Sequence, residues 1–332
     1  MLKIVSLFSG AGGLDLGFSQ AGFQVIYANE YDKAIWETYR KNHPETYLDI
    51  RNIKDVPSAD IPDCDGIIGG PPCQSWSEGG AQRGIEDERG QLFYEFIRIL
   101  RDKQPKFFLA ENVSGMLQPK HKTALEAIKQ TFVDSGYHLF IKLLNAADYG
   151  VAQDRERLIF IGFRKDLNIQ YQFPAANPNK LTLNDVIADL AVNAVPAIDK
   201  TKPNPQALKR NHEYMTGDFS SIYMSRNRVR SWHEASFTIQ ASGRQAALHP
   251  SAPKMVKVGK DQFAFVTGAT YRRLSVRECA RIQGFPDNFE FIYNNVDKGY
   301  KMIGNAVAVE FARHIAISIR HYINKKIQLR EV

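Results

Sequence analysis

Short apolar runs alternate with helical patterns through the first half of the chain. The apolar runs lie at residues 3–8, 24–28, 66–68, 106–110, 138–144 and 158–163. Between several of them, apolar side chains recur every three or four residues, which predicts helices at 33–41, 91–100 and 121–134. Strands that alternate with helices favour a mostly parallel sheet covered on both faces, so the sequence predicts a doubly wound α/β fold.

The texture of the sequence changes at about residue 173. Prolines at positions 174, 178, 196, 203 and 205 interrupt the alternation, and loops with short strands replace helices as far as about residue 270. We therefore expect a first domain at 1–172, a smaller, mostly irregular or β domain at 173–285, and a C-terminal segment at 286–332 that returns to the first domain. In that segment Gly304-Asn305-Ala306-Val307 is predicted to open the last helix, at 308–324.

Composition is ordinary for a soluble globular protein, with 44% hydrophobic and 24% charged residues among 332. No apolar run approaches the roughly 20 residues of a membrane-spanning helix, and no signal segment opens the chain. The three cysteines, Cys64, Cys73 and Cys279, have neither metal-ligand spacing nor the even count of a disulfide framework. A cytoplasmic protein with no metal site, no membrane partner and at most one reactive thiol is expected.

The net charge of +7 only weakly favours a polyanionic partner, but the basic residues are unevenly distributed. A cluster of them comprises Lys209, Arg210, Arg226, Arg228, Arg230 and Arg244. Period-two spacing would place the arginines at 226, 228 and 230 on one side of an extended segment. Arginine reads guanine bidentately, and Gln245 adds a donor and an acceptor. The segment is a candidate nucleic-acid surface, with a solvated basic strand as the alternative.

A stiff loop follows the apolar run at 66–68. Its residues, Gly69-Gly70-Pro71-Pro72-Cys73, include two prolines that fix their own φ and favour extended neighbours. The loop is therefore expected to present the Cys73 thiol in one direction, although a tight turn with a buried structural cysteine fits the motif alone equally well. The polar segment 75–90 that follows is expected to form a lid.

A glycine loop, Ser9-Gly10-Ala11-Gly12-Gly13, joins the first predicted strand to a helix. Glycines let the backbone approach a ligand closely, and a helix N-terminus offers unpaired N–H groups. Glu30 lies 20 residues after Gly10, where a doubly wound fold places the carboxylate that binds a ribose, although Asp15 breaks the dinucleotide pattern. Asp49 and Ile50 could offer an acceptor and an apolar wall to a purine, and a helix cap or turn is the alternative for Asp49.

Two further charged groups are predicted near the sheet. Glu111 follows an apolar strand, at the carboxyl edge where open α/β sheets bind ligands. Gln153, Arg155 and Arg157 alternate before the strand at 158–163, so the two arginines are expected to share a face and to clamp a carboxylate or phosphate. The alternative interpretation is that these charged residues only keep an edge strand soluble.

Taken in order, these motifs resemble those of bacterial DNA (cytosine-5)-methyltransferases. The matching pieces are Phe8 to Gly13, Asn29-Glu30, Gly70-Pro71-Pro72-Cys73-Gln74, Glu111-Asn112-Val113, Gln153 to Arg157, Arg273 to Pro286, and Gly304-Asn305-Ala306-Val307. The variable segment resembles the GGCC-specific modification enzymes of the HaeIII type through residues 224–230, 240–245 and 299–303. Two positions depart from the family pattern: Leu48 replaces a glycine and Ala308 replaces a proline.

The resemblance implies a Rossmann-like methyltransferase domain, a target-recognition domain, and S-adenosyl-L-methionine as cofactor. It implies that Cys73 attacks C6 of a flipped cytosine, that Glu111 holds or protonates N3, and that Arg155 and Arg157 orient the base carbonyl and either the glutamate or a phosphate. The implied cofactor-binding residues are Phe8, Ser9, Gly10, Gly12, Gly13, Glu30, Asp49, Ile50, Pro71, Leu92 and Asn305. The implied DNA-binding residues are Arg226, Arg228, Arg230, Arg244 and Gln245.

The implied partner is double-stranded DNA, with the inner cytosine of GGCC as the methylated base. The enzyme would be a monomer that works alongside a restriction endonuclease without a stable protein partner. Two alternatives stay open at this point: a cytosine-5 methyltransferase that acts on tRNA, and a DNA-binding paralogue without catalysis.

Overall fold

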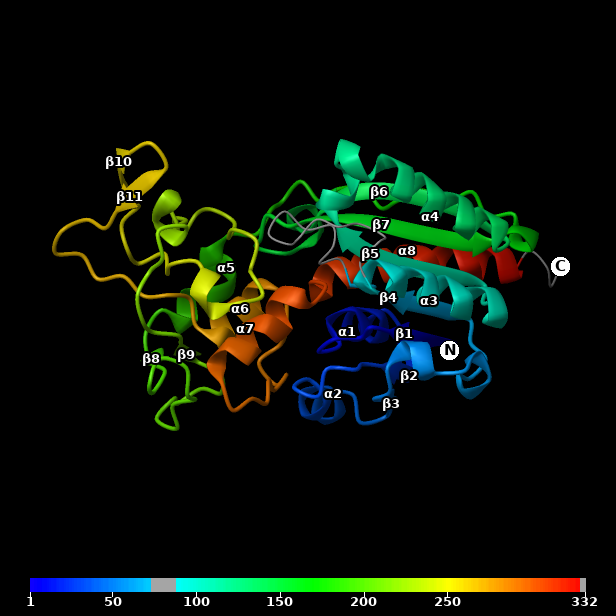
Figure 1. Cartoon of the computed structure of the whole chain (residues 1–332), viewed down its shortest axis with the longest axis horizontal. Coiled ribbons are helices and arrows are strands. Elements are labelled where there is room, and N and C mark those ends of the chain that lie inside the picture. Colours follow the sequence, from blue (N-terminus) through cyan, green and yellow to red (C-terminus); the bar gives the residue numbers. More distant parts are fainter. Residues whose placement is uncertain (73–87, 329–332) are drawn as a thin grey trace. The chain divides into compact units, whose positions relative to one another are not determined.

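The computed structural model describes residues 1–72 and 88–328, and these residues form two compact units (Figure 1). The first unit comprises Met1–Asn145, Glu156–Ala176 and Phe311–Val332, and the second comprises Ala146–Arg155 and Asn177–Glu310. Residues 286–310 therefore belong to the second unit, and only the chain from Phe311 onward packs with the first. The domain boundaries expected after residues 172 and 285 remain predictions.

A seven-stranded sheet with the order β3-β2-β1-β4-β5-β7-β6 forms the centre of the first unit. Its strands are β1 (Leu2–Leu7), β2 (Phe23–Asn29), β3 (Tyr47–Asp49), β4 (Gly66–Gly69), β5 (Phe107–Val113), β6 (Tyr137–Asn145) and β7 (Glu156–Arg164). The first five strands in that order are parallel, whereas β7 runs antiparallel to both β5 and β6. The doubly wound α/β fold predicted from the apolar runs is confirmed.

Helices cover both faces of this sheet. They are α1 (Gly13–Gln20), α2 (Trp36–Asn42), α3 (Glu88–Lys103), α4 (Lys122–Asp134) and α8 (Val309–Gln328). Successive residues of a strand point to opposite faces, and accordingly Phe107 stacks on Phe18 of α1 while Phe108 stacks on Phe132 of α4, with ring centroids 6.5 and 4.4 Å apart. This packing fixes β5, which carries Glu111, between two apolar layers.

The second unit has little regular structure, in agreement with the irregular and β texture of its sequence. It contains α5 (Leu183–Ile187), α6 (Val276–Ile282), α7 (Val296–Asn305) and two small sheets, β8 (Val195–Pro196) with β9 (Glu213–Tyr214) and β10 (Val256–Gly259) with β11 (Gln262–Ala264). Ser275 and Glu278 form a capping box at the start of α6. Cys279 on that helix is fully buried, and burial raises the pKa of its thiol well above the ordinary value.

The motif Gly304-Asn305-Ala306-Val307 does not open the last helix, contrary to the prediction. Its first two residues end α7, the backbone is extended at Ala306, and α8 begins at Val309. By length and composition, Val296–Lys326 could span a membrane, but 67% of its apolar window is buried inside the protein. The cores of water-soluble proteins contain helices with the same properties, so this stretch is weak evidence for a membrane span.

Candidate active site and nucleic-acid interface

The loop that leads to Cys73 is held against β5. Gly69 at the end of β4 pairs with Ala110, and the Asn112 side-chain amide donates to the carbonyl of Pro71 over 3.3 Å. A Cβ atom added at Gly70 would lie 3.4 Å from Oε2 of Glu111, so the loop backbone runs directly beside that carboxylate. Cys73 itself lies outside the described residues.

Glu111 forms an ion pair with Arg157 from the neighbouring strand. The Arg157 Nε atom lies 2.6 Å from Glu111 Oε1, and the two side chains are 12% and 11% exposed. Val113 pairs with Arg157 across β5 and β7, which places Arg157 diagonally opposite Glu111. Arg157 thus clamps a carboxylate, as its position in the alternating motif predicted. Because little water reaches the pair, the attraction between the two charges is only weakly screened. The guanidinium therefore restricts the orientation of the carboxylate.

Arg155 does not share that face, and this part of the prediction is wrong. Its side chain is 2% exposed, and the guanidinium donates to the carbonyls of Gly304 and Ala306, each over 2.9 Å, and more weakly to Ile239. Period-two alternation requires a continuous strand, whereas β7 begins only at Glu156. Gln153 is also buried and binds Gln283 and the N–H of Ile239. These two motif residues support backbone elements of the second unit.

The glycine loop and Glu30 meet at one edge of the sheet. Phe8, Gly10 and Gly12 have φ values of 55°, 56° and 87°, and these left-handed conformations turn the chain sharply before α1. The Gly10 N–H donates to Glu30 Oε2 over 2.9 Å, and the Asp32 N–H donates to Oε1 over 2.7 Å. The Glu30 carboxylate is therefore held beside the loop, as the 20-residue spacing indicated.

The Asp49 carboxylate is bonded inside the protein, as in the turn that was the alternative for this residue, and its contact with a purine stays a prediction. The carboxylate accepts hydrogen bonds from four donor groups, the Tyr27 hydroxyl and the backbone N–H, Nε and one terminal nitrogen of Arg51, which matches the roughly four lone-pair sites of a carboxylate. Burial raises the pKa of Asp49, but the bonds from Arg51 and Tyr27 outweigh it, and the pKa lies below its ordinary value. The adjacent Ile50 is half-buried.

A buried polar cluster supports the glycine loop from below. The Asp15 carboxylate is fully buried and accepts from the hydroxyls of Ser6 and Tyr39, each over 2.6 Å. His43 stacks on Tyr39 and lies so close to the loop that a Cβ atom added at Gly12 would be 2.1 Å from its Nε2. Asp15, the residue that breaks the dinucleotide pattern, therefore has a structural role in the buried cluster that supports the glycine loop.

The other residues predicted to bind the cofactor differ in their exposure to solvent, and the two residues that depart from the family pattern are buried. Pro71 and Gly13 are buried, Ser9 is half-buried, Phe8 and Leu92 pack against the core, and Asn305 is exposed at the end of α7. Leu48 in β3 and Ala308 before α8 are both buried. Tyr31, which directly follows Glu30 and is 67% exposed, was not among the predicted residues. The signal in the sequence is an aromatic residue next to a candidate ribose ligand, and its exposure is visible only in the structure.

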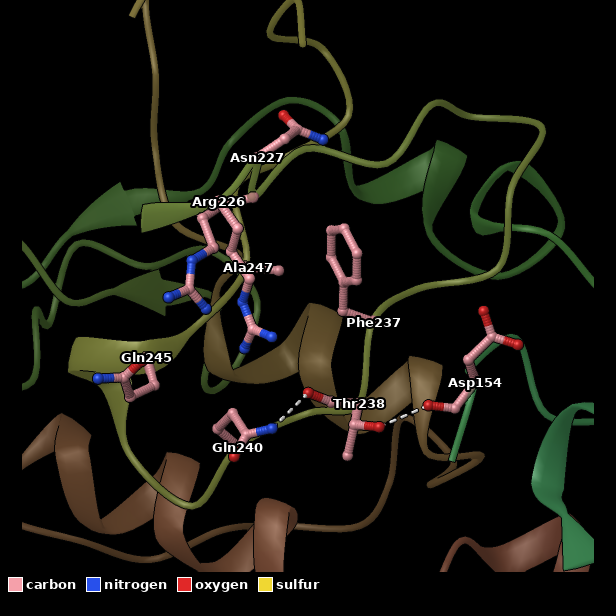
Figure 2. Close-up of a pocket in the computed structure, with 9 residues that line it drawn as sticks. Asp154, Arg226, Asn227, Phe237, Thr238, Gln240, Gln245 and Ala247 are labelled. Atoms are coloured by element: carbon pink, nitrogen blue, oxygen red, sulfur yellow. Dashed lines mark hydrogen bonds between the residues drawn. The ribbon is translucent and has the colours of Figure 1, made fainter. Parts of the chain in front are cut away.

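A polar hollow of about 200 Å³ lies in the second unit. Figure 2 shows Arg226 and Gln245 across this hollow from Phe237 and Asp154. Its other lining residues are Asn227, Arg228, Thr238, Gln240 and Ala247. The Thr238 hydroxyl donates to the carbonyl of Asp154 over 2.6 Å, and the Gln240 amide donates to the carbonyl of Thr238. Residues predicted to bind DNA from two separate segments therefore line one cavity.

The arginines at 226, 228 and 230 do not form one free face, contrary to the prediction. Arg228 is buried, donates to the carbonyls of Tyr223 and Ile222, and lies over the Tyr223 ring. Arg230 forms ion pairs with Asp154 and Glu234. Arg226 and Arg244 are exposed, and neither has an ion-pair partner among residues 1–72 and 88–328. Tertiary packing thus leaves only part of the basic cluster available for a ligand.

Known proteins resemble the chain over nearly its full length. A family model described as C-5 cytosine-specific DNA methylase matches residues 2–321. The Type II methyltransferase M.FnuDI of Fusobacterium nucleatum is 56% identical, with 99% of this chain and 97% of the relative covered. M.NgoPII of Neisseria gonorrhoeae is also 56% identical, with coverage of 98% and 97%.

A solved structure shows the same fold at much lower identity. The crystal structure of Spodoptera frugiperda DNMT2 superposes with a TM-score of 0.70 at 18% identity, covering 96% of this chain and 100% of that one. The doubly wound sheet, the ordered motifs along it and the full-length match to the family model lead to one conclusion. The chain belongs to the family of C-5 cytosine-specific DNA methylases.

Proposed function

We propose that the protein methylates C5 of the inner cytosine in GGCC sites of duplex DNA, as the modification enzyme of a restriction–modification system. The observation that carries the chemistry is the Glu111–Arg157 ion pair beside the loop that leads to Cys73. Full-length similarity to Type II methyltransferases supports the biological setting. The enzyme would act as a cytoplasmic monomer, paired in function but not in structure with an endonuclease.

In the proposed mechanism, Cys73 supplies the nucleophile. Its thiolate would add to C6 of cytosine, and the ring electrons would shift to C5, the atom to which S-adenosylmethionine would supply its methyl group, with S-adenosylhomocysteine as the leaving product. Transfer of the C5 proton to a base would then restore the ring double bond and expel the Cys73 thiolate. Because C5 and C6 are stacked inside a duplex, the target cytosine must first leave the helix, at a cost of a few kcal/mol.

Glu111 would hold a proton at N3 of the cytosine while charge develops in the ring. A hydrogen bond that strengthens in the transition state lowers the barrier. The bond from Arg157 to Glu111 Oε1 supports this role, since it orients the carboxylate and leaves Oε2 on the side of the Gly70 backbone. Arg157 would therefore act through Glu111. Arg155 is not assigned a contact with the base, because its guanidinium binds backbone carbonyls.

The glycine loop and Glu30 have the chemistry that S-adenosylmethionine requires. Carboxylates bind ribose hydroxyls in doubly wound folds, and Glu30 lies at the loop next to the exposed ring of Tyr31, which could stack on adenine. Ile50 would add an apolar wall. When bound, S-adenosylmethionine supplies an electrophilic methyl group on its sulfonium.

Replacing Glu30 with glutamine is expected to weaken cofactor binding about 10- to 100-fold. Hydrogen bonds to a charged group contribute about 1.5–3 kcal/mol, and each 1.4 kcal/mol corresponds to a factor of ten. Calorimetric titration with S-adenosylhomocysteine measures the loss directly. The exposed Glu37, on α2, provides a matched control, and Glu37→Gln should bind like the wild type. Equal affinities of the two variants would contradict the assignment of Glu30.

The target assignment is tested by bisulfite sequencing of a plasmid from cells that express the protein. Protection of one cytosine in every GGCC confirms the reaction and the site together. Protection at another short motif keeps the reaction and discards GGCC. If no cytosine is protected although the protein is soluble, a structured RNA becomes the substrate to assay, and specific DNA binding without methylation would point to a non-catalytic role.

A further inference from the structure

One face of α7 holds the segment 240–245, which carries Gln240, Arg244 and Gln245. Asp297, Tyr300 and Gly304 are spaced by three and four residues, so they lie along one side of the helix. Asp297 and Tyr300 both contact the segment at Gly243, and Gly304 contacts it at Gln240 and Ala241. The segment is thus fixed along its length by a single helix.

Asp297 binds the start of the short turn Gly243–Gln245. Its Oδ1 accepts from the Gly243 N–H over 2.7 Å and from the Ser242 hydroxyl over 3.1 Å. The same hydroxyl accepts from the N–H of Arg244 over 3.3 Å. One carboxylate oxygen therefore orders the backbone immediately before Arg244.

Tyr300 and Gly304 hold the segment by close packing. A Cβ atom added at Gly243 would lie 2.7 Å from the Tyr300 ring, so the backbone lies against that ring without room for a side chain. The Tyr300 hydroxyl donates to the carbonyl of Leu274 over 2.6 Å, which fixes the ring in turn. A Cβ atom added at Gly304 would lie 2.4 Å from the backbone N of Ala241. The helix and the segment are in backbone contact at this point.

Arg155 completes the support at the other end of the segment. Its guanidinium spans the carbonyls of Ile239 and Gly304, which joins the residue before Gln240 to the last turn of α7. The backbone is therefore held on both sides of Gln240. By contrast, the side chains of Gln240 and Arg244 are exposed, and that of Gln245 is half-buried in the wall of the hollow.

We propose that this face of α7 sets the sequence specificity of the enzyme, with Asp297 as its principal positioning residue. Base readout by arginine and glutamine depends on bidentate hydrogen bonds, which tolerate only small displacements. A backbone fixed by Asp297, Tyr300 and Gly304 presents Arg244 and Gln245 in one geometry, so a wrong base leaves their donors unpaired. The inference rests on the proposed function, since it assumes that these side chains read DNA bases.

The test compares Asp297→Ala, Asp297→Asn and the wild type on a GGCC duplex and on duplexes with one substituted base pair. Dissociation constants and methylation rates are both measured. Asp297→Ala should lower the ratio of cognate to substituted affinity at least 10-fold. Asp297→Asn keeps an acceptor oxygen, so its affinity ratio should lie between those of Asp297→Ala and the wild type. Lys298→Ala, an exposed change at the next position, should match the wild type. Binding of S-adenosylhomocysteine should be unchanged in all variants.

The wild-type duplex data separate a failure of this inference from a failure of the proposed function. If the wild type prefers another recognition site, the ratio of cognate to substituted affinity is measured at that site. If the wild type binds DNA without methylating it, this ratio of affinities alone tests the inference. An unchanged ratio in Asp297→Ala overturns the inference. A loss of cofactor binding together with specificity would also overturn it, because that result indicates general damage to the fold.

Discussion

Cys73→Ser should abolish methyl transfer while the protein still binds its DNA site. A serine hydroxyl is a far weaker nucleophile than a thiolate, and serine needs an adjacent base for activation, which the proposed mechanism does not provide. The other two cysteines cannot replace Cys73. Burial raises the pKa of the Cys64 thiol to about 12 and that of Cys279 well above its ordinary value, so both stay protonated at neutral pH.

The measurement is transfer of a labelled methyl group from S-adenosylmethionine to a duplex, together with a gel-shift assay of DNA binding. Cys64→Ser is the matched control and should retain wild-type activity. Methylation by Cys73→Ser above about one hundredth of the wild-type rate would exclude Cys73 as the nucleophile, because a hydroxyl that no base activates cannot replace a thiolate. Loss of DNA binding would instead show that the loop has a structural role.

Glu111→Gln should reduce the methylation rate about 10²- to 10⁴-fold, the range typical of a lost proton-transfer group. Glutamine has nearly the same shape and can still accept a hydrogen bond from Arg157, so the fold should survive. Its neutral amide cannot hold a proton at N3 as a carboxylate does. The expected result is a fall in kcat with little change in the affinity for DNA or for S-adenosylhomocysteine.

A second substitution tests whether Arg157 acts through Glu111. Arg157→Lys keeps the charge but loses the planar fork that fixes the carboxylate, so its effect should be smaller than that of Glu111→Gln. The double variant should be little worse than Glu111→Gln alone, since groups that act as a unit are not additive. Additive losses, or a wild-type rate for Glu111→Gln, would refute the proposed role.

The arrangement of the strands was predictable, and with it the position of Glu111. Buried parallel strands appear as short continuous apolar runs, and their carboxyl ends meet at one edge of the sheet. The apolar run at 106–110 therefore predicted that Glu111 would lie at the carboxyl edge of the sheet, where ligands bind. In the structure this position brings the Glu111 carboxylate next to the loop backbone at Gly70.

The roles of several charged residues were not predictable, because they depend on contacts distant in sequence. Arg155 binds carbonyls that lie 149 and 151 residues away, and period-two spacing carries no information about them. Tyr27 reaches Asp49 from 22 residues away and helps to occupy a carboxylate that looked available. Arg230 is neutralised partly by Asp154, 76 residues distant. Local spacing thus identified the charged groups but not their partners.

The support of segment 240–245 by main-chain atoms has a consequence for the evolution of new specificities. Asp297, Gly304 and Arg155 bind or contact backbone atoms. Every amino acid provides the carbonyl, and every amino acid except proline provides the N–H. The side chains at positions 240 and 244 can therefore change without loss of the contacts that hold the segment. A library randomised at these two positions, selected for survival against endonucleases of different specificity, would explore new recognition sequences on an unchanged scaffold.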